Sequence, residues 1–170
     1  MGLTAALLTF LDWAQRMSTL KYLIHGQPVA ALGTLHEGRP FVSMVPFAVL
    51  PDGSAMVIHV SHLATHTKDM LDSPGVSIMV VAPPAPELSP QELPRVTIQG
   101  QAVLCDATSP RYAEAKSAYV ERFSQSAGMF DFADFQLFLI EPTSARYVGG
   151  FARAATLGPD ELADVLRREG

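Results

Sequence analysis

The sequence is poor in cysteine, in basic residues and in long apolar runs, and each shortage excludes a class of protein. Cys105 is the only cysteine among 170 residues, so no internal disulfide can form, which is typical of the reducing cytoplasm. Lys and Arg total 12 against 17 Asp and Glu, a net charge of −5, whereas nucleic-acid binding needs clustered cations. No segment reads as a membrane span. We therefore expect a cytoplasmic protein with neither a nucleic-acid nor a membrane partner.

Standard catalytic signatures are also missing. The sequence has no Gly-x-Gly-x-x-Gly motif after a strand, no phosphate-binding loop and no Gly-x-Ser-x-Gly elbow. A single cysteine excludes cysteine-based zinc sites, and His62 and His66, four residues apart, lack the glutamate of the His-Glu-x-x-His motif. We expect no metal site, and the sequence identifies no catalytic residue.

Apolar residues, in contrast, are plentiful. Hydrophobic residues make up 48% of the chain and charged residues 17%, enough apolar material for one sizeable core. A length of 170 residues suits a single domain, which we place at residues 1–170. The apolar share also leaves some surface for a subunit interface.

The spacing of apolar residues and turn signals predicts many short strands and few helices. Leu7, Leu11 and Ala14 follow helical spacing and predict a first helix from Thr4 to about His25. Strands are expected at residues 29–36, 41–50, 55–60, 76–81, 95–104 with a bend at Gly100, 135–140 and 145–148. Further helices are expected within residues 61–72, from a Ser109 cap to residue 123, and at 161–168. Strands at such close spacing favour a barrel, because closure removes exposed edges.

A cluster of polar residues lies where the short helix after residue 61 should begin. Ser61, Thr65, His66, Thr67 and Lys68 combine hydroxyls with one or two cations, and a helix N-terminus adds free backbone N–H groups. Such a combination can hold a ligand phosphate. The same residues can also form an ordinary helix cap surrounded by solvated side chains, which stabilises a helix without any function.

Several motifs in order carry a resemblance to a known family. They are Gly38-Arg39-Pro40 with Ser43 and Val45-Pro46-Phe47, then Ser61-x-Leu63-Ala64-x-His66-Thr67, Pro94-Arg95-Val96-Thr97-Ile98-x-Gly100, Asp131-Phe132-x-Asp134-Phe135 and Tyr147-Val148-Gly149-Gly150-Phe151-Ala152-Arg153-Ala154. Together they span most of residues 20–155. The sequence resembles the FMN-binding split-barrel superfamily, whose best-known member is pyridoxamine 5′-phosphate oxidase. Within that superfamily it is most similar to the haem-utilisation branch.

The resemblance implies a fold and an assembly. The fold is mainly β (α+β), a six-stranded antiparallel split β-barrel with flanking helices. Two such barrels form a homodimer, with FMN as the cofactor in two sites at the subunit interface.

The resemblance also implies site residues. The FMN phosphate would be held by Ser43, Ser61, His66, Thr67 and Lys68. The flavin ring would lie along the backbone of Met44, Val45, Pro46 and Phe47, and Arg153 would reach the flavin or a substrate from the partner subunit. A departure is Asp69, where the branch usually has Asn, since a carboxylate would weaken a phosphate site if it pointed inward.

Two functions follow as alternatives. The first is an FMN-dependent oxidoreductase acting on a small-molecule substrate that the sequence does not identify. The second is a flavin or haem binding and handling module without turnover. The haem-degrading relatives carry a further C-terminal part that helps to bind haem, whereas this sequence has no histidine after His66, so haem binding through a C-terminal histidine is not expected.

Overall fold

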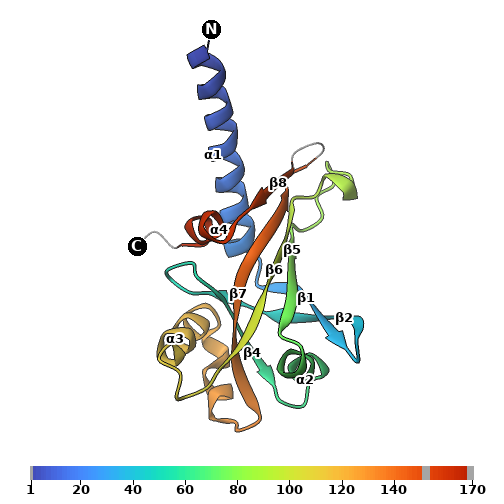
Figure 1. Ribbon diagram of the computed structural model, residues 1–170, viewed down its shortest axis with the longest axis vertical. Coiled ribbons are helices and arrows are strands. Elements are labelled where there is room, and N and C mark those ends of the chain that lie inside the picture. Colours follow the sequence, from blue (N-terminus) through green and yellow to red (C-terminus); the bar gives the residue numbers. More distant parts are fainter. Residues whose placement is uncertain (1, 151–153, 168–170) are drawn as a thin grey trace.

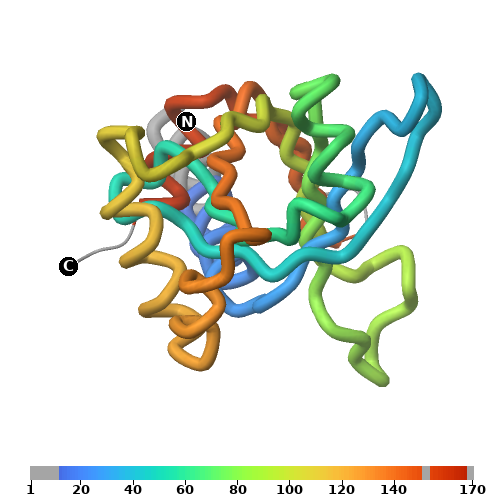
Figure 2. The backbone as a smooth tube through the Cα atoms, turned by 90° about the horizontal axis from the view of Figure 1, so that it is seen from below, coloured from blue at the N-terminus to red at the C-terminus, as the bar shows by residue number. Residues whose placement is uncertain are grey.

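A single antiparallel sheet organises the chain in the computed structural model, which describes residues 2–150 and 154–167, with side chains from residue 12 onward. Its eight strands are β1 (Val29–His36), β2 (Arg39–Pro46), β3 (Ala48–Val49), β4 (Met56–Ser61), β5 (Gly75–Val81), β6 (Arg95–Cys105), β7 (Phe135–Val148) and β8 (Ala154–Leu157). They follow the order β2-β1-β5-β6-β7-β4-β3, with β8 added to β7. Seen along its long axis, the sheet curls around a central core (Figure 2). The structure therefore confirms the predicted split-barrel α+β fold.

The helices flank the sheet at its ends and on one side. They are α1 (Gly2–Gly26), α2 (Thr65–Asp72), α3 (Tyr112–Arg122) and α4 (Pro159–Leu166), with 3-10 turns at Pro90–Glu92 and Ser124–Asp131. Figure 1 shows α1 and α4 together at one end of the barrel and α2 at the opposite end. No helix in the described residues is long and apolar enough to cross a membrane.

The structure has eight strands, whereas the sequence pattern predicts seven and the family resemblance implies six, and the reasons for the difference are local. The predicted strand 41–50 divides at Phe47, because the chain pairs with β1 up to Pro46 and with β4 from Ala48. A short strand, β8, follows the family motif near the end of the chain and pairs with β7 over Ala154–Leu157. Neither feature has a hydrophobic pattern long enough to be recognised in the sequence.

The two strands expected at 135–140 and 145–148 are one continuous strand, β7. Pro142 lies between the two predicted strands, and proline lacks the N–H that a central strand needs. In the structure, β4 pairs with β7 up to Ile140 and β8 pairs with it from Ala145, so Pro142 has only β6 beside it. Pro142 also lies opposite Gly100, where the β6–β7 register shifts, which confirms the predicted bend at that glycine.

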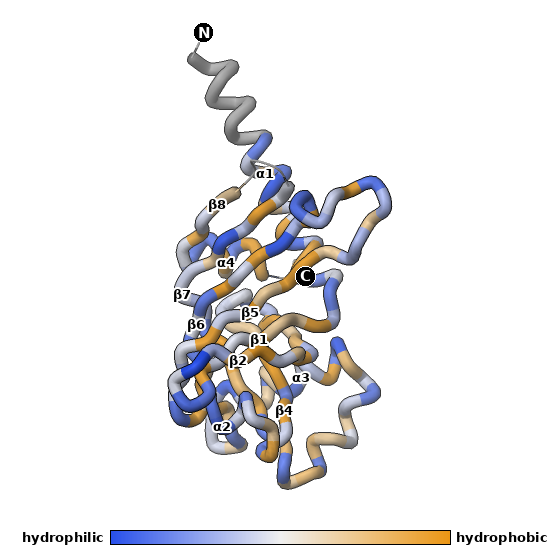
Figure 3. The backbone as a smooth tube through the Cα atoms, turned by 90° about the vertical axis from the view of Figure 1, so that its right-hand side faces the viewer, coloured by the Kyte–Doolittle hydropathy of each residue, from blue (hydrophilic) through white to orange (hydrophobic). Residues whose placement is uncertain are grey.

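The core has two parts, one on each face of the sheet. Inside the curl, buried side chains of the strands pack with Leu20 and Ile24 of α1 and with Leu162 and Leu166 of α4. On the outer face of β4 and β7, a second cluster packs under α3 and includes Tyr119. Figure 3 shows the apolar stretches running along the strands, whereas α2 is mainly hydrophilic. Helix α2 is thus placed at the barrel end by polar contacts as much as by burial.

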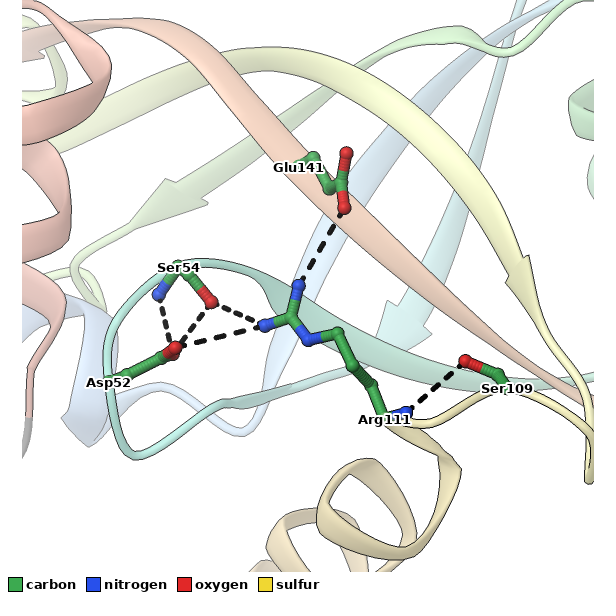
Figure 4. Close-up of polar contacts among 5 residues, drawn as sticks. All are labelled: Asp52, Ser54, Ser109, Arg111 and Glu141. Carbon is green, nitrogen blue, oxygen red and sulfur yellow. Dashed lines mark hydrogen bonds and ion pairs between the residues drawn. The ribbon is translucent and has the colours of Figure 1, made fainter.

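Arg111 links α3 to the sheet (Figure 4). Its guanidinium donates to Ser54 Oγ and lies 3.9 Å from an Asp52 oxygen and 3.7 Å from a Glu141 oxygen. The Arg111 backbone N–H donates to Ser109 Oγ at 3.3 Å. Ser109, the predicted N-cap, therefore forms a turn before the helix, and Arg111 occupies the N-cap position of α3. These contacts fix α3 against the β3–β4 turn and β7.

His59, on β4 within the second cluster, predicts a dependence of stability on pH. Burial, with some repulsion from Lys116, lowers its pKa to about 4, whereas an unfolded histidine has a pKa near 6.5. Below about pH 6.5 the His59 ring is protonated in the unfolded chain, whereas in the folded chain it stays neutral until the pH approaches 4. The free energy of unfolding therefore falls as the pH drops toward 4. We expect this group alone to lower the free energy of unfolding by about 1–2 kcal/mol between pH 7 and pH 5.

Urea unfolding at the two pH values, in the wild type and in His59→Phe, measures this contribution. The variant should lose that part of the pH dependence while the rest remains. An identical pH dependence in both proteins would contradict the assignment to His59.

Candidate functional site

The turn from β4 into α2 is tightly built from its own polar groups. The Ser61 carbonyl oxygen accepts hydrogen bonds from Ala64 N–H at 3.1 Å and from Thr67 Oγ1 at 2.7 Å. Ser61 Oγ in turn accepts from Leu63 N–H at 3.2 Å. Thr67 is fully buried, and its hydroxyl proton is committed to Ser61. Ser61 and Thr67, both predicted to hold a phosphate, therefore also fix the shape of the turn.

The first turn of α2 offers backbone donors. Ala64 caps the helix without any side-chain hydrogen bond, and the N–H groups of Thr67 and Lys68 already donate to the Ala64 carbonyl oxygen. The N–H groups of Thr65 and His66 precede them and have no acceptor within the helix. The partial positive charge of a helix N-terminus favours an anion at this point.

Two side-chain atoms of the predicted site residues are buried without a hydrogen-bond partner among the described residues, Ser43 Oγ and His66 Nε2. Ser43 lies on the face of β2 that also carries buried Val45, and Thr34, on the same inward face of neighbouring β1, reaches α2 through Asp69. Burial lowers the pKa of His66, and the opposing effect of Asp69 is smaller. Since a buried polar atom without a partner is costly, both atoms are candidates for contact with a ligand.

Asp69 does not point toward this candidate ligand position. Its carboxylate, 5% exposed, accepts a hydrogen bond from Thr34 Oγ1 at 2.8 Å and contacts His36 Nδ1 at 2.8 Å. The expected weakening of a phosphate site by Asp69 therefore does not follow, because Asp69 ties α2 to β1 instead. The signal in the sequence was Thr34 itself, a polar residue at an inward position of a strand whose other inward residues, Ala30 and Leu32, are apolar.

The other predicted site residues have varied surroundings. Lys68 is exposed, Met44 is 63% exposed, Val45 is buried in the core and Pro46 is half-buried. Strand β2 stands at one end of the strand order with β1 as its only ladder partner among the described strands, so its outer backbone edge can meet a flavin or another chain. Arg153 lies outside the described residues, and its role stays a prediction.

No group of three or more His, Cys, Asp or Glu side chains in the described part of the chain is arranged to hold a metal ion. His62 is exposed at the turn, while His66 is half-buried in the helix that follows. Ser43, His66 and the backbone N–H groups of the first turn of α2 are uncharged hydrogen-bond donors. Such a set suits a phosphate, or a ligand that binds a neutral imidazole.

Comparison with known proteins identifies the same family as the resemblance noted in the sequence. Residues 18–149 match the family model described as pyridoxamine 5′-phosphate oxidase. That range runs from the second half of α1 to the end of β7, and it includes the β4–α2 turn.

Three individual relatives have names that mention haem. The chain is 36% identical over 147 residues to "Non-canonical heme oxygenase HOZ, chloroplastic" of Arabidopsis thaliana, covering 85% of this chain and 43% of that protein. It is 29% identical over 134 residues to "Heme oxygenase HutZ" of Vibrio cholerae, covering 78% and 75%. A haem-binding protein from Mycobacterium smegmatis superposes with a TM-score of 0.78 at 28% identity, covering 88% of this chain and 60% of that one. The chain thus spans less than half of the plant relative.

Proposed function

The chain belongs to the pyridoxamine 5′-phosphate oxidase family, and from this membership we propose that it binds haem and acts in haem handling. The observation that carries the proposal is the similarity, over 147 and 134 residues, to two proteins named heme oxygenase, together with the similarity to a structure named for haem binding. This favours the alternative of the sequence analysis, haem handling, over flavin-dependent oxidation.

The side chains of the candidate site are compatible with haem. A histidine that binds iron must be neutral and must have a free ring nitrogen. His66 meets both conditions, since its pKa is lowered by burial and Nε2 has no partner among the described residues. His25 and His36, by contrast, contact the Leu166 carbonyl oxygen and Asp69. Bound haem would supply an iron centre and an oxidisable porphyrin.

Titration of the purified protein with hemin, followed by its Soret absorption, tests this function. We expect saturable binding, weakened about 10-fold or more in His66→Ala, because loss of an iron-binding imidazole would remove more than one ordinary hydrogen bond. His62→Ala, at an exposed position of the same turn, is the matched control and should bind like the wild type. Absence of saturable binding by the wild type would refute haem handling. Ascorbate is then added in air to distinguish haem storage from haem degradation. A Soret band that persists indicates storage, and a Soret band that disappears indicates degradation.

FMN is a second candidate ligand, favoured by the unpartnered Ser43 Oγ and His66 Nε2 and by the first turn of α2, which has no side-chain cap. In this arrangement, these two residues and the first N–H groups of α2 would hold the phosphate, and Lys68 would contribute its charge from the surface. FMN would supply the redox chemistry.

We expect Ser43→Ala to weaken FMN binding about 5- to 10-fold, since it removes one donor to the phosphate. Quenching of flavin fluorescence on titration measures the affinity. Ser54→Ala, at the distant β3–β4 turn, should leave it unchanged. If Ser43→Ala binds FMN as tightly as the wild type, Ser43 is not part of a phosphate site.

We further propose that the protein is a homodimer joined through the outer face of β2, β1 and β5. The register places Met44, Ala31 and Met79 side by side across these strands, and both methionines are exposed, by 63% and 40%. Val29 and Val81 extend the row, and no charged side chain interrupts it. An exposed apolar patch of this kind supports an interface with a second copy, because a two-fold axis lets one patch cover itself.

A further inference from the structure

A cavity of about 220 Å³ lies on the outer face of β4 and β7, between the sheet and the loops around α3. Its floor is formed by His59, Cys105 and Leu137, and its walls by Tyr112, Phe130 and Phe135. Exposed Ala107 and Ala133, from the loops before α3 and before β7, lie at its mouth. None of the described residues of the candidate haem or FMN site lines this cavity.

His59 is a buried polar side chain without a polar partner. Its ring is 6% exposed and stacks on Phe130, with ring centroids 3.9 Å apart and planes 3° apart, while Tyr119 meets it edge-on at 5.7 Å. Nδ1 has no hydrogen-bond partner, and the described structure shows ring contacts but no hydrogen bond for this imidazole. Burial keeps the ring neutral at pH 7, so one nitrogen can donate and the other can accept.

Gln136 adds a second unused polar group to the same cavity. Its Oε1 is buried and has no partner among the described residues. Gln136 pairs with Val60 in the β4–β7 ladder, one position from the pair of His59 with Leu137. Each unpartnered buried group costs about 1–3 kcal/mol, so two of them beside one cavity indicate that something else supplies the missing hydrogen bonds.

The cavity carries no formal charge on its floor. Lys116 stands over the ring of Phe130, 4.9 Å from its centroid, and is not among the described residues that line the cavity. The Asp106 carboxylate, at the exposed rim, already accepts hydrogen bonds from Thr108 N–H at 2.9 Å and Oγ1 at 2.6 Å. An ionised ligand would lose its hydration without gaining a partner on the floor, which excludes charged molecules.

We propose that this cavity binds a small neutral aromatic molecule that carries one hydroxyl or ring N–H group. The size matches a single ring, since a dry cavity of roughly 150 Å³ can hold benzene. The aromatic walls favour a planar ring, and the polar group of the ligand forms the hydrogen bonds that His59 and Gln136 lack.

Phenol is the probe, and toluene, which has the same shape without the hydroxyl, is the matched control ligand. Cys105 on the floor is the only thiol in the chain, so its alkylation rate by N-ethylmaleimide reports occupancy of the cavity. Phenol should slow this alkylation and bind about 10-fold more tightly than toluene in the wild type, as one or two hydrogen bonds predict. In His59→Phe, which keeps the aromatic stack, the preference for phenol should shrink to about 3-fold or less.

Three further results test whether His59 and Gln136 bind the polar group of the ligand. Gln136→Leu should reduce the preference for phenol as well, and it provides an independent test if His59→Phe does not fold. His62→Phe, at an exposed position outside the cavity, should keep the full preference. Equal binding of phenol and toluene by the wild type, or no binding of either by calorimetry and by Cys105 protection, would overturn the proposal and leave a cavity filled by water only.

Discussion

Replacing Asp69 by alanine is expected to lower the free energy of unfolding by about 2–4 kcal/mol, because the buried carboxylate is the partner of two other groups. The variant leaves the hydroxyl of Thr34, itself 4% exposed, without an acceptor inside the barrel. It also frees His36, whose Nδ1 lies 2.8 Å from the carboxylate. These contacts join α2 to β1 over a separation of more than thirty residues along the chain.

Urea unfolding at pH 7 measures the effect. Asp72→Ala is the matched control, since Asp72 is exposed at the end of the same helix, and should change stability by less than about 0.5 kcal/mol. Asp69→Asn keeps an acceptor for Thr34 and should lose less than Asp69→Ala. A double-mutant cycle with Thr34→Val isolates the pair, and additive losses would show that the hydrogen bond contributes nothing.

Because α2 carries His66, the same substitution has a functional consequence. A loosened helix no longer holds its first turn against Ser61 and the inward face of β2, so ligand affinity should fall together with stability. If Asp69→Ala loses stability while haem and FMN bind as before, then the ligand does not use the first turn of α2.

The sequence predicts the elements of this fold well where a single local pattern decides them. Strand β1 has the predicted bounds, Val29–His36, because a glycine turn follows and alternate residues face the core. The bend at Gly100 is present for a similar reason, since a glycine inside a strand pattern marks a close approach. A Cβ at Gly100 would lie only 2.5 Å from the Glu141 carbonyl oxygen.

Elements were mispredicted where a neighbour far away in the chain decides the outcome. Pro142 breaks a strand only if both of its sides are paired, and this depends on where β4 ends and β8 begins. The split at Phe47 depends on a change of partner strand, from β1 up to Pro46 to β4 from Ala48. Patterns within a window of ten residues contain no information about such partners.

The candidate site shows the same division. Residue types at the β4–α2 turn predict phosphate-binding chemistry from the sequence, and this stays a prediction. The sequence does not predict which of these side chains already form hydrogen bonds within the protein. Thr67 donates to the Ser61 carbonyl oxygen, and Asp69 accepts from Thr34, only in the folded barrel. The cavity at His59 was not predicted at all, because it exists only after α3 packs on β4 and β7.

The second large effect is expected on the assembly. A double variant, Met44→Glu with Met79→Glu, places two carboxylates beside Ala31 at the centre of the proposed interface. Burying unpaired charges costs several kcal/mol per ion, and the two-fold axis repeats each of them on the partner, so the dimer should dissociate. Sedimentation equilibrium should give the wild type about twice the chain mass of 18.3 kDa and the variant a single chain mass.

The choice of positions makes the result specific to the interface. Both methionines are already exposed in a single chain, so the substitutions should not affect folding, and far-UV circular dichroism should match the wild type. Tyr22→Glu, on α1 and 82% exposed, introduces the same charge away from this face and should leave the dimer intact. A single-chain mass for the wild type, or a variant that stays dimeric, would contradict the interface. Since the ligand is expected where two chains meet, dissociation of the dimer should also abolish FMN or haem binding. Ligand binding at the β4–α2 turn would then depend on the interface formed by the outer face of β2, β1 and β5.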